Sequence, residues 1–161
     1  MKKASKICLL IGGILGLVLA LLYLVLSIVY FAAGASMTAW INGADIGEAA
    51  REWLRNMARA DGYYYATMEA FEAHCYSRGA TFLVMMLFAI PAAIISFILR
   101  GKEKTGLPLP IVLAVLSWSG NIAAFAGAAL AIVNWAIVER KEGQQPAEEK
   151  KEEKPEEPKA E

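Results

Sequence analysis

Side chains of the kind that carry out catalysis are scarce in this chain. Its 161 residues include one histidine, His74, and two cysteines. A single histidine excludes the usual two-histidine motif of zinc proteases. Glu72 and His74 are two residues apart, so on a helix they would point about 200° apart and would not converge on a metal. No nucleophile lies beside a base, and no glycine-rich phosphate loop follows a strand. We therefore expect no enzymatic activity, no metal and no cofactor.

Charge is absent from three long stretches, and each predicts a helix in a lipid bilayer. The first covers residues 7–33, and as a helix it would be about 40 Å long. That length exceeds the roughly 30 Å of hydrocarbon in a bilayer, and backbone amides find no water in lipid, so the segment must cross as a helix. A cleaved signal peptide is disfavoured because its apolar part has only about 7–15 residues. The second stretch, 79–99, predicts a second transmembrane helix.

Basic residues predict the side of the membrane that each end faces. Three lysines lie within residues 1–6, and the short loop 100–106 holds three further bases. Short basic segments stay in the cytoplasm. We therefore expect a cytoplasmic N-terminus, a cytoplasmic loop and an extracytoplasmic segment over 34–78, in a multi-pass protein of the cell membrane. No basic patch is interleaved with aromatic residues, so nucleic acid is not an expected partner.

The extracytoplasmic segment carries amphipathic patterns of its own. Apolar residues recur at helical spacing over 45–61, which predicts an amphipathic helix there. Asp45, with Glu48 three residues later, resembles a capping box at the start of this helix. A second amphipathic pattern over 63–78 predicts a helix that leads into the second span.

Three arginines mark the polar side of the helix over 45–61. Arg51, Arg55 and Arg59 recur once per turn, opposite an apolar side that includes Trp53. The helix has two interpretations. It lies in the outer membrane interface, with the arginines as candidate lipid-headgroup ligands, or it packs over the outer ends of the two spans. The sequence leaves both open.

The third uncharged stretch, 107–138, is too long for a simple span. As one helix its 32 residues would be about 48 Å long and would need more tilt than the usual 0–40°. A turn-like cluster at 117–121 offers a break. The stretch therefore forms either one long third crossing or a hairpin that returns to the cytoplasm. We slightly favour the third crossing because the arms of a hairpin would be short. The Glu- and Lys-rich tail 139–161 is expected to be disordered. A third crossing would place this tail outside the cell, whereas a hairpin would place it in the cytoplasm.

Small and amide residues within the apolar stretches are candidates for close helix packing. Glycine and alanine at four-residue spacing let helices approach each other, and polar groups at membrane depth are candidate functional sites. The candidate helix-packing residues are Gly12, Gly16, Gly120, Ala124, Gly127, Asn121 and Asn134.

Three segments resemble a known group of proteins. KASKICLLIGGILGLVLA, KTGLPLPIVLAVLS and SGNIAAFAGAALAIV are similar to small Gly- and Leu-rich multi-pass membrane proteins of Gram-positive bacteria, which are grouped as domains of unknown function. The resemblance covers about residues 4–33 and 100–138. It implies a bacterial plasma membrane, and it transfers no active residue.

The expected protein is thus an all-α membrane protein of three hydrophobic helices, an amphipathic helical connection and a charged tail. Its expected function is non-catalytic, through association of helices with a second copy or with another membrane protein, and its expected surroundings are the lipid bilayer. Two alternatives stay open. One is a small oligomeric transport or channel component lined by Ser117, Asn121 and Asn134. The other is sensing of the lipid surface by the helix over 45–61.

Overall fold

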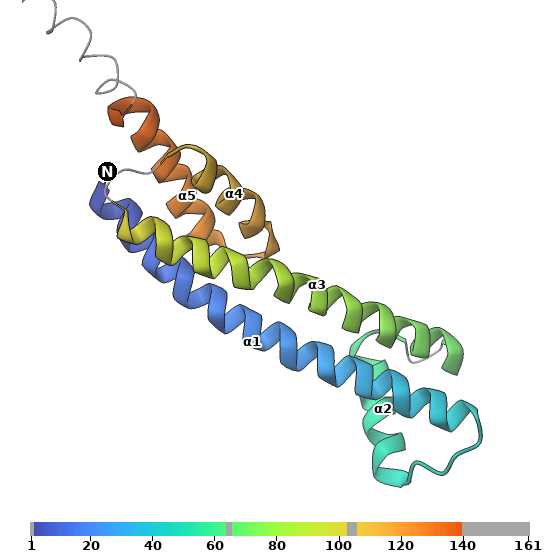
Figure 1. Cartoon of the computed structure of the whole chain (residues 1–161). Helices are drawn as coiled ribbons and strands as arrows, with labels where there is room; N and C mark the ends of the chain where they lie inside the picture. The colour runs from blue at the N-terminus through green and yellow to red at the C-terminus, as the bar shows by residue number, and fades with distance from the viewer. Residues whose placement is uncertain (1, 64–65, 103–105, 140–161) are drawn as a thin grey trace, which may run out of the picture. The chain divides into compact units, whose positions relative to one another are not determined.

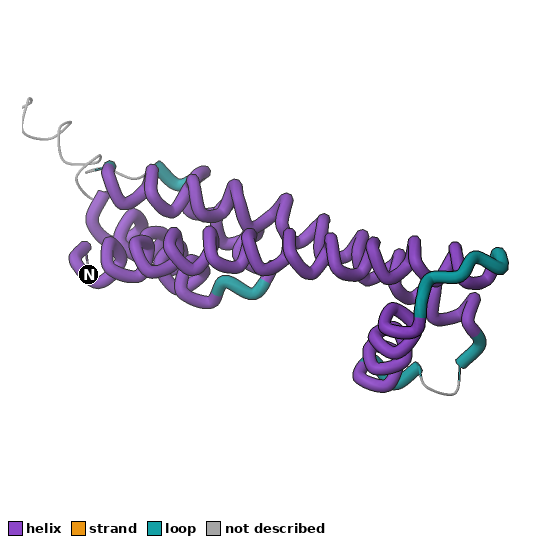
Figure 2. The backbone as a smooth tube through the Cα atoms, turned by 90° about the horizontal axis from the view of Figure 1, so that it is seen from below, coloured by secondary structure: helices purple, strands orange, loops and turns teal. Residues whose placement is uncertain are grey.

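The computed structural model describes residues 2–63, 66–102 and 106–139, and the regular structure in these ranges is entirely helical (Figures 1 and 2). The all-α expectation is therefore confirmed. The five α-helices are α1 (Lys2–Ile41), α2 (Glu48–Ala60), α3 (Met68–Gly101), α4 (Pro108–Leu116) and α5 (Ile122–Asn134). Two short turns accompany them, the 3₁₀ turn η1 (Ser117–Ser119) and the π-helical turn η2 (Trp135–Glu139).

The chain forms two compact units. One, here called the hairpin unit, comprises residues 1–15 and the chain from residue 92 onward. The other, here called the α2 unit, comprises residues 16–91. The long helices α1 and α3 contribute residues to both units, whereas α2 belongs to one and the pair α4 and α5 to the other.

Helices α1 and α3 are both long and apolar enough to cross a membrane. They contain the two expected spans, 7–33 and 79–99, but each continues well beyond its span. In particular, the amphipathic pattern over 63–78 does not form a separate helix. Its residues from Met68 onward are the first turns of α3, and the Thr67 hydroxyl accepts a hydrogen bond from the backbone N–H of Ala70 at 3.2 Å at the start of this helix.

The stretch 107–138 is broken, as the hairpin alternative requires, and it is not the continuous helix that we slightly favoured. Gly120 ends η1 with a left-handed φ of 104°, a conformation that glycine adopts without strain. Asn121 then caps α5, because its side-chain oxygen accepts a hydrogen bond from the N–H of Ala124. Helices α4 and α5 therefore pack against each other (Figure 1). With 9 and 13 residues, they measure about 14 and 20 Å, so neither is long enough to cross a bilayer alone.

Each unit has its own apolar core. The core of the hairpin unit joins α1, α3, α4 and α5 through Leu9, Ala92, Leu99, Leu113, Ala124 and Ala128. The core of the α2 unit joins α1, α2 and α3 through Ala33, Met37, Leu54, Phe71 and Cys75.

Helix α2 begins two residues later than the capping-box pattern suggested, because the N-cap is at residue 47 and not at residue 45. Its first residue is Glu48, and Gly47, at a φ of 77°, stands at its N-cap position. Asp45 instead accepts a hydrogen bond from the N–H of Gly47 at 3.1 Å and pairs with Arg51 at 2.6 Å. The acidic side chain thus stabilises the loop before the helix, and the glycine conformation sets where the helix begins.

The apolar side of α2 packs inside the α2 unit. Leu54 is 1% exposed, and Ile46, Met57 and Ala58 pack against the same core. Trp53 remains 41% exposed. Most of the apolar side is therefore occupied by α1 and α3, as the packing interpretation requires, and is not free to enter acyl chains.

Candidate functional site

Two candidate packing glycines lie against other helices of the same chain. A Cβ atom added to Gly12 of α1 would lie 2.6 Å from both the Cα and the N of Ala124 in α5. A Cβ added to Gly127 would lie 3.0 Å from side-chain atoms of Leu9 and 3.1 Å from its backbone nitrogen. Because no side chain fits at the first position, α1 and α5 approach with backbone against backbone. Gly16, the other candidate in α1, is buried within the α2 unit.

Asn121 holds the turn of the hairpin against α1. Its amide nitrogen donates to the carbonyl of Gly12 at 2.7 Å, and its amide oxygen accepts from the N–H of Ala124 at 3.0 Å. The side chain is 2% exposed. A water-lined pore would need this amide to face a cavity, but it bonds a neighbouring helix of the same chain. Asn134 is also buried, at 6% exposed, in the last turn of α5, and Gly120 lies in the turn itself.

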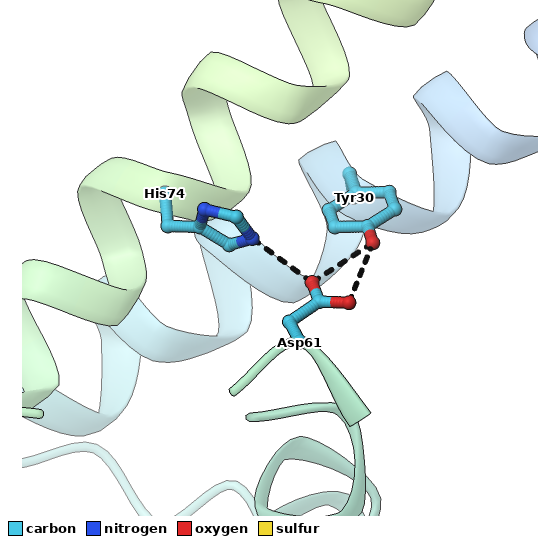
Figure 3. Close-up of polar contacts among 3 residues, drawn as sticks. All are labelled: Tyr30, Asp61 and His74. Atoms are coloured by element: carbon cyan, nitrogen blue, oxygen red, sulfur yellow. Dashed lines mark hydrogen bonds and ion pairs between the residues drawn. The ribbon is translucent and has the colours of Figure 1, made fainter. Parts of the chain in front are cut away.

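A cluster of three polar side chains joins the three helices of the α2 unit (Figure 3). Asp61 follows the last residue of α2. Its carboxylate accepts hydrogen bonds from the hydroxyl of Tyr30 in α1 at 2.8 and 3.1 Å. The same carboxylate contacts Nε2 of His74 in α3 at 2.9 Å. The side chains of His74 and Asp61 are only 10% and 20% exposed. We call Tyr30, Asp61 and His74 the Asp61 cluster, and its hydrogen bonds tie the end of α2 to both long helices.

Aromatic rings enclose the imidazole of this cluster. Tyr63 stacks on His74 with ring centroids 4.1 Å apart, and Phe71 lies at 6.2 Å. Cys75, next along α3, is fully buried, and burial raises the pKa of its thiol to about 11. A thiol with that pKa remains protonated near neutral pH and is a weak nucleophile. Across residues 2–63, 66–102 and 106–139, no three His, Cys, Asp or Glu side chains gather as a metal site would require.

A second polar contact continues along the same faces of α1 and α3. The hydroxyl of Thr38 donates to the carbonyl of Gly34 at 3.0 Å, contacts the carboxylate of Glu72, and lies 3.1 Å from the hydroxyl of Tyr76. The ring of Tyr76 also packs where a side chain at Gly34 would stand. Glu72 therefore faces α1 and not the Asp61 cluster.

The three arginines of α2 have different surroundings. Arg51 pairs with Asp45 and lies 5.8 Å from the ring centroid of Trp40, a cation–π distance. Arg55 and Arg59 line a pocket in the α2 unit. The sequence places all three on one stripe, but only the last two reach this pocket.

The pocket has a volume of about 640 Å³ and lies among the ends of α1, α2 and α3. Its apolar wall comes from all three helices and the connection after α2, and includes Met37, Trp40, Leu54, Ala58, Tyr63, Met68 and Phe71. Its volume falls within the roughly 300–1,000 Å³ of small-molecule sites, which combine apolar walls with a few placed polar groups. We call it the arginine groove.

Sequence reasoning did not find the Asp61 cluster or the arginine groove. Tyr30 and Asp61 are 31 residues apart and come from different helices, whereas hydrophobic periodicity describes one helix at a time. The sequence contains Tyr30, Asp61 and the single histidine, His74, but only the tertiary packing of the helices brings these three side chains into contact. No protein-family model matches the chain, and neither a curated protein nor a solved structure matches it.

Proposed function

We propose that the chain is a non-catalytic integral membrane protein whose helices α1 and α3 cross the cell membrane. The observation that carries the proposal is the outward exposure of apolar side chains on these helices. Only 28% of the most apolar 18-residue segment of each of these two helices is buried. Large exposed side chains follow one another along α1, namely Leu17, Val18, Leu21, Leu22, Leu24, Val25 and Ile28. Soluble monomers rarely expose an apolar surface that is continuous over such a length.

In the proposed arrangement, α4 and α5 form a hairpin that enters the membrane from the cytoplasmic side and returns to that side. Asn121, at the turn, bonds Gly12, which lies about 8 Å into the apolar stretch of α1. Farther along α5, Gly127 accepts a hydrogen bond from the hydroxyl of Ser5 at 3.2 Å, and Ser5 lies among the basic residues of the N-terminus. Helix α5 thus runs back toward that end. This geometry favours two crossings with a cytoplasmic tail, in place of the three crossings expected from the sequence.

Irregular backbone is tolerated in a bilayer only where protein covers it or supplies its hydrogen bonds. The turn meets this condition, because the N–H groups of Gly120 and Asn121 both donate to the carbonyl of Ser117, at 3.2 and 3.1 Å. Trp118 and Ile122, which are 88% and 81% exposed, would contact lipid at this shallow depth, where tryptophan is common.

The proposed role is association within the membrane, with lipid, a second copy or another membrane protein, through the exposed apolar sides of α1 and α3. The small-residue contacts at Gly12 and Gly127 serve packing within the chain, so they do not supply the surface for association. The channel alternative loses its main support because Asn121 bonds within the chain. The resemblance to multi-pass proteins of Gram-positive bacteria remains a proposal, and it favours a bacterial plasma membrane.

Extraction and labelling test this proposal. A Cys8→Ala background leaves Cys75, which is buried and should react only slowly in the folded protein near neutral pH. We expect the chain to stay in the membrane pellet after alkaline carbonate. A membrane-impermeant maleimide should label Ala44→Cys in intact cells, and should label Lys102→Cys only after permeabilisation. Release by carbonate, or equal labelling of both positions in intact cells, would contradict the proposal.

A further inference from the structure

Helix α2 is only lightly buried within the α2 unit. Of its 13 residues, Leu54 alone is buried, and Trp53 beside it is 41% exposed. Between α2 and the ends of α1 and α3, the arginine groove leaves about 640 Å³ unfilled. Segments with few buried contacts are the ones that open locally while the rest of a protein stays folded. Helix α2 has the character of such a segment.

Glycines in open space flank α2 on both sides. Gly43 and Gly47, with φ of 84° and 77°, precede the helix, and Gly62, with a φ of 79°, follows it. At all three positions, no atom from elsewhere in the chain lies within 4 Å of the place where a Cβ would stand. Hinges are a few loop residues that absorb backbone rotation, and glycine rotates with the least steric restriction. The two connections therefore allow α2 to turn as one piece.

Side-chain contacts at the end of α2 hold it in the packed position. The Asp61 carboxylate accepts a hydrogen bond from the Tyr30 hydroxyl at 2.8 Å and contacts Nε2 of His74 at 2.9 Å. A charged acceptor strengthens such bonds, and both partners share one carboxylate, so loss of Asp61 removes both contacts together. Near the start of α2, Arg51 lies 5.8 Å from the ring of Trp40, a contact that is weak where it is exposed. The Asp61 cluster is therefore the main polar attachment of the helix.

We propose that α2 is a latched lid, which packs on α1 and α3 while the Asp61 cluster is intact and moves onto an anionic lipid surface when this cluster opens. In the released state, the apolar side with Trp53 and Leu54 enters the boundary between head groups and acyl chains. The stripe of Arg51, Arg55 and Arg59 then faces the lipid phosphates. The two interpretations that the sequence left open thus describe two states of one helix, and the structure is that of the latched state.

The position of α2 along the long helices suits this exchange. Met37 and Trp40 of α1 line the groove beside α2, and they lie about 6 and 10 Å beyond the end of the apolar stretch 7–33 at 1.5 Å per residue. In the proposed membrane arrangement this is the level of the lipid head groups, so the released helix reaches them without a long movement. This level rests on the proposed function, whereas the hinges and the latch are features of the α2 unit itself.

Fluorescence quenching of the full chain in lipid nanodiscs tests the proposal. Ala49, an exposed residue on the apolar side of α2, is replaced by a coumarin amino acid, and the quencher is a lipid with a nitroxide near the head-group end of its acyl chain. The discs contain phosphatidylcholine, with or without about 30% phosphatidylglycerol as the anionic lipid. We expect Asp61→Ala to at least double the quenching in the anionic discs, because it opens the latch. Unchanged quenching in this variant, with unchanged helix content by circular dichroism, would overturn the lid.

Neutral discs and a charge-matched variant sharpen this test. The rise caused by Asp61→Ala should be much smaller in discs of phosphatidylcholine alone, and a rise of the same size there would refute an anionic surface as the partner. Glu69→Gln removes one negative charge from an exposed position near the start of α3. It should leave the quenching nearly unchanged, since a single exposed charge contributes little. An equal rise in Glu69→Gln and Asp61→Ala would contradict the latch.

A reversible cross-link keeps the lid closed in the same chain. Ala58 of α2 and Met68 of α3 both line the arginine groove, so Ala58→Cys and Met68→Cys in the Cys8→Ala background can be bridged across it by a short disulfide-forming reagent. In the Asp61→Ala chain, the bridge should abolish the added quenching, and its reduction should restore it. Quenching that persists in the bridged chain would overturn the proposal, because α2 could not then have left α3.

The lid and the proposed function fail in different ways. Carbonate extraction and the labelling of Ala44→Cys and Lys102→Cys do not depend on whether α2 is released. If those results hold and the quenching does not rise, the lid alone is rejected. Release of the chain by carbonate would instead reject the membrane crossings and, with them, the lipid surface on which the lid is proposed to lie.

Discussion

The hairpin unit and the α2 unit hold their helices together by different means. In the hairpin unit, α5 approaches α1 until the backbones meet at Gly12 and Ala124, and one amide, that of Asn121, joins them. In the α2 unit, α2 is attached by its packed apolar side and by polar and aromatic side chains that reach across from α1 and α3. Close backbone packing tolerates no added atom, whereas side-chain contacts can be removed one at a time. The two units should therefore respond differently to mutation.

The largest expected effect is in the hairpin unit. Gly12→Val would place a branched side chain where even a Cβ lies 2.6 Å from the backbone of Ala124. The helices must separate, and we expect a loss of stability of about 3 kcal/mol or more, measured by thermal unfolding in detergent. Gly101→Ala is the control, because nothing lies within 4 Å of a Cβ at that position. A small, equal change in both variants would show that α5 does not pack on α1 in this way.

Asn121→Leu should have the next largest effect. It removes the cap of α5 and the bond to the Gly12 carbonyl, and it leaves the buried N–H of Ala124 without a partner. We expect about 2 kcal/mol of destabilisation. Asn121→Asp keeps an oxygen for the cap but loses the donor to Gly12, so it separates the two bonds. If Asn121→Leu unfolded at the temperature of the unmodified chain, the assigned role of this amide would be wrong.

In the α2 unit the expected effect is smaller and local. Asp61→Ala removes the acceptor shared by Tyr30 and His74, and we expect about 1–2 kcal/mol of destabilisation. Hydrogen exchange should become faster in α2 and stay unchanged in α4 and α5, because the apolar core of each unit remains. Glu52→Gln, an exposed change on the same helix, serves as the control. Faster exchange throughout both units would contradict the local nature of the Asp61 cluster.

The smallest expected effect concerns reactivity and not stability. Burial raises the pKa of the Cys75 thiol to about 11, so the reactive thiolate forms only as the pH rises towards that value. In the Cys8→Ala variant, the maleimide reaction of Cys75 in the folded protein should be slow at pH 7. Its rate should rise about tenfold per pH unit up to pH 10. A rate that levels off below pH 9 would show that the thiol is not buried as described.

Local sequence patterns predicted the helices well, because they depend on periodicity and on the absence of charge. The apolar stretches 7–33 and 79–99 lie in α1 and α3, and the turn-like cluster at 117–121 coincides with the break between α4 and α5. The choice between a third crossing and a hairpin was not accessible, because it depends on contacts between residues more than 100 positions apart, such as Gly12 with Asn121. The tail 139–161 lies outside the described residues apart from Glu139.

The candidate sites were less predictable than the helices. Helical spacing places Arg51, Arg55 and Arg59 on one stripe, but it does not show that Asp45 holds the first while the other two line a groove. Likewise, the spacing of Tyr30, Asp61 and His74 contains no sign of their contact. Side chains from separate helices define these features, so a single sequence indicates their components and not their assembly.

The position of the C-terminal tail tests the central claim most directly, because it depends on whether α4 and α5 return to the cytoplasmic side. The measurement is maleimide labelling of Glu161→Cys in the Cys8→Ala background, with Ala44→Cys as the positive control in intact cells. The account predicts that Glu161→Cys is labelled only after permeabilisation. Labelling of Glu161→Cys in intact cells, at the level of Ala44→Cys, would contradict it.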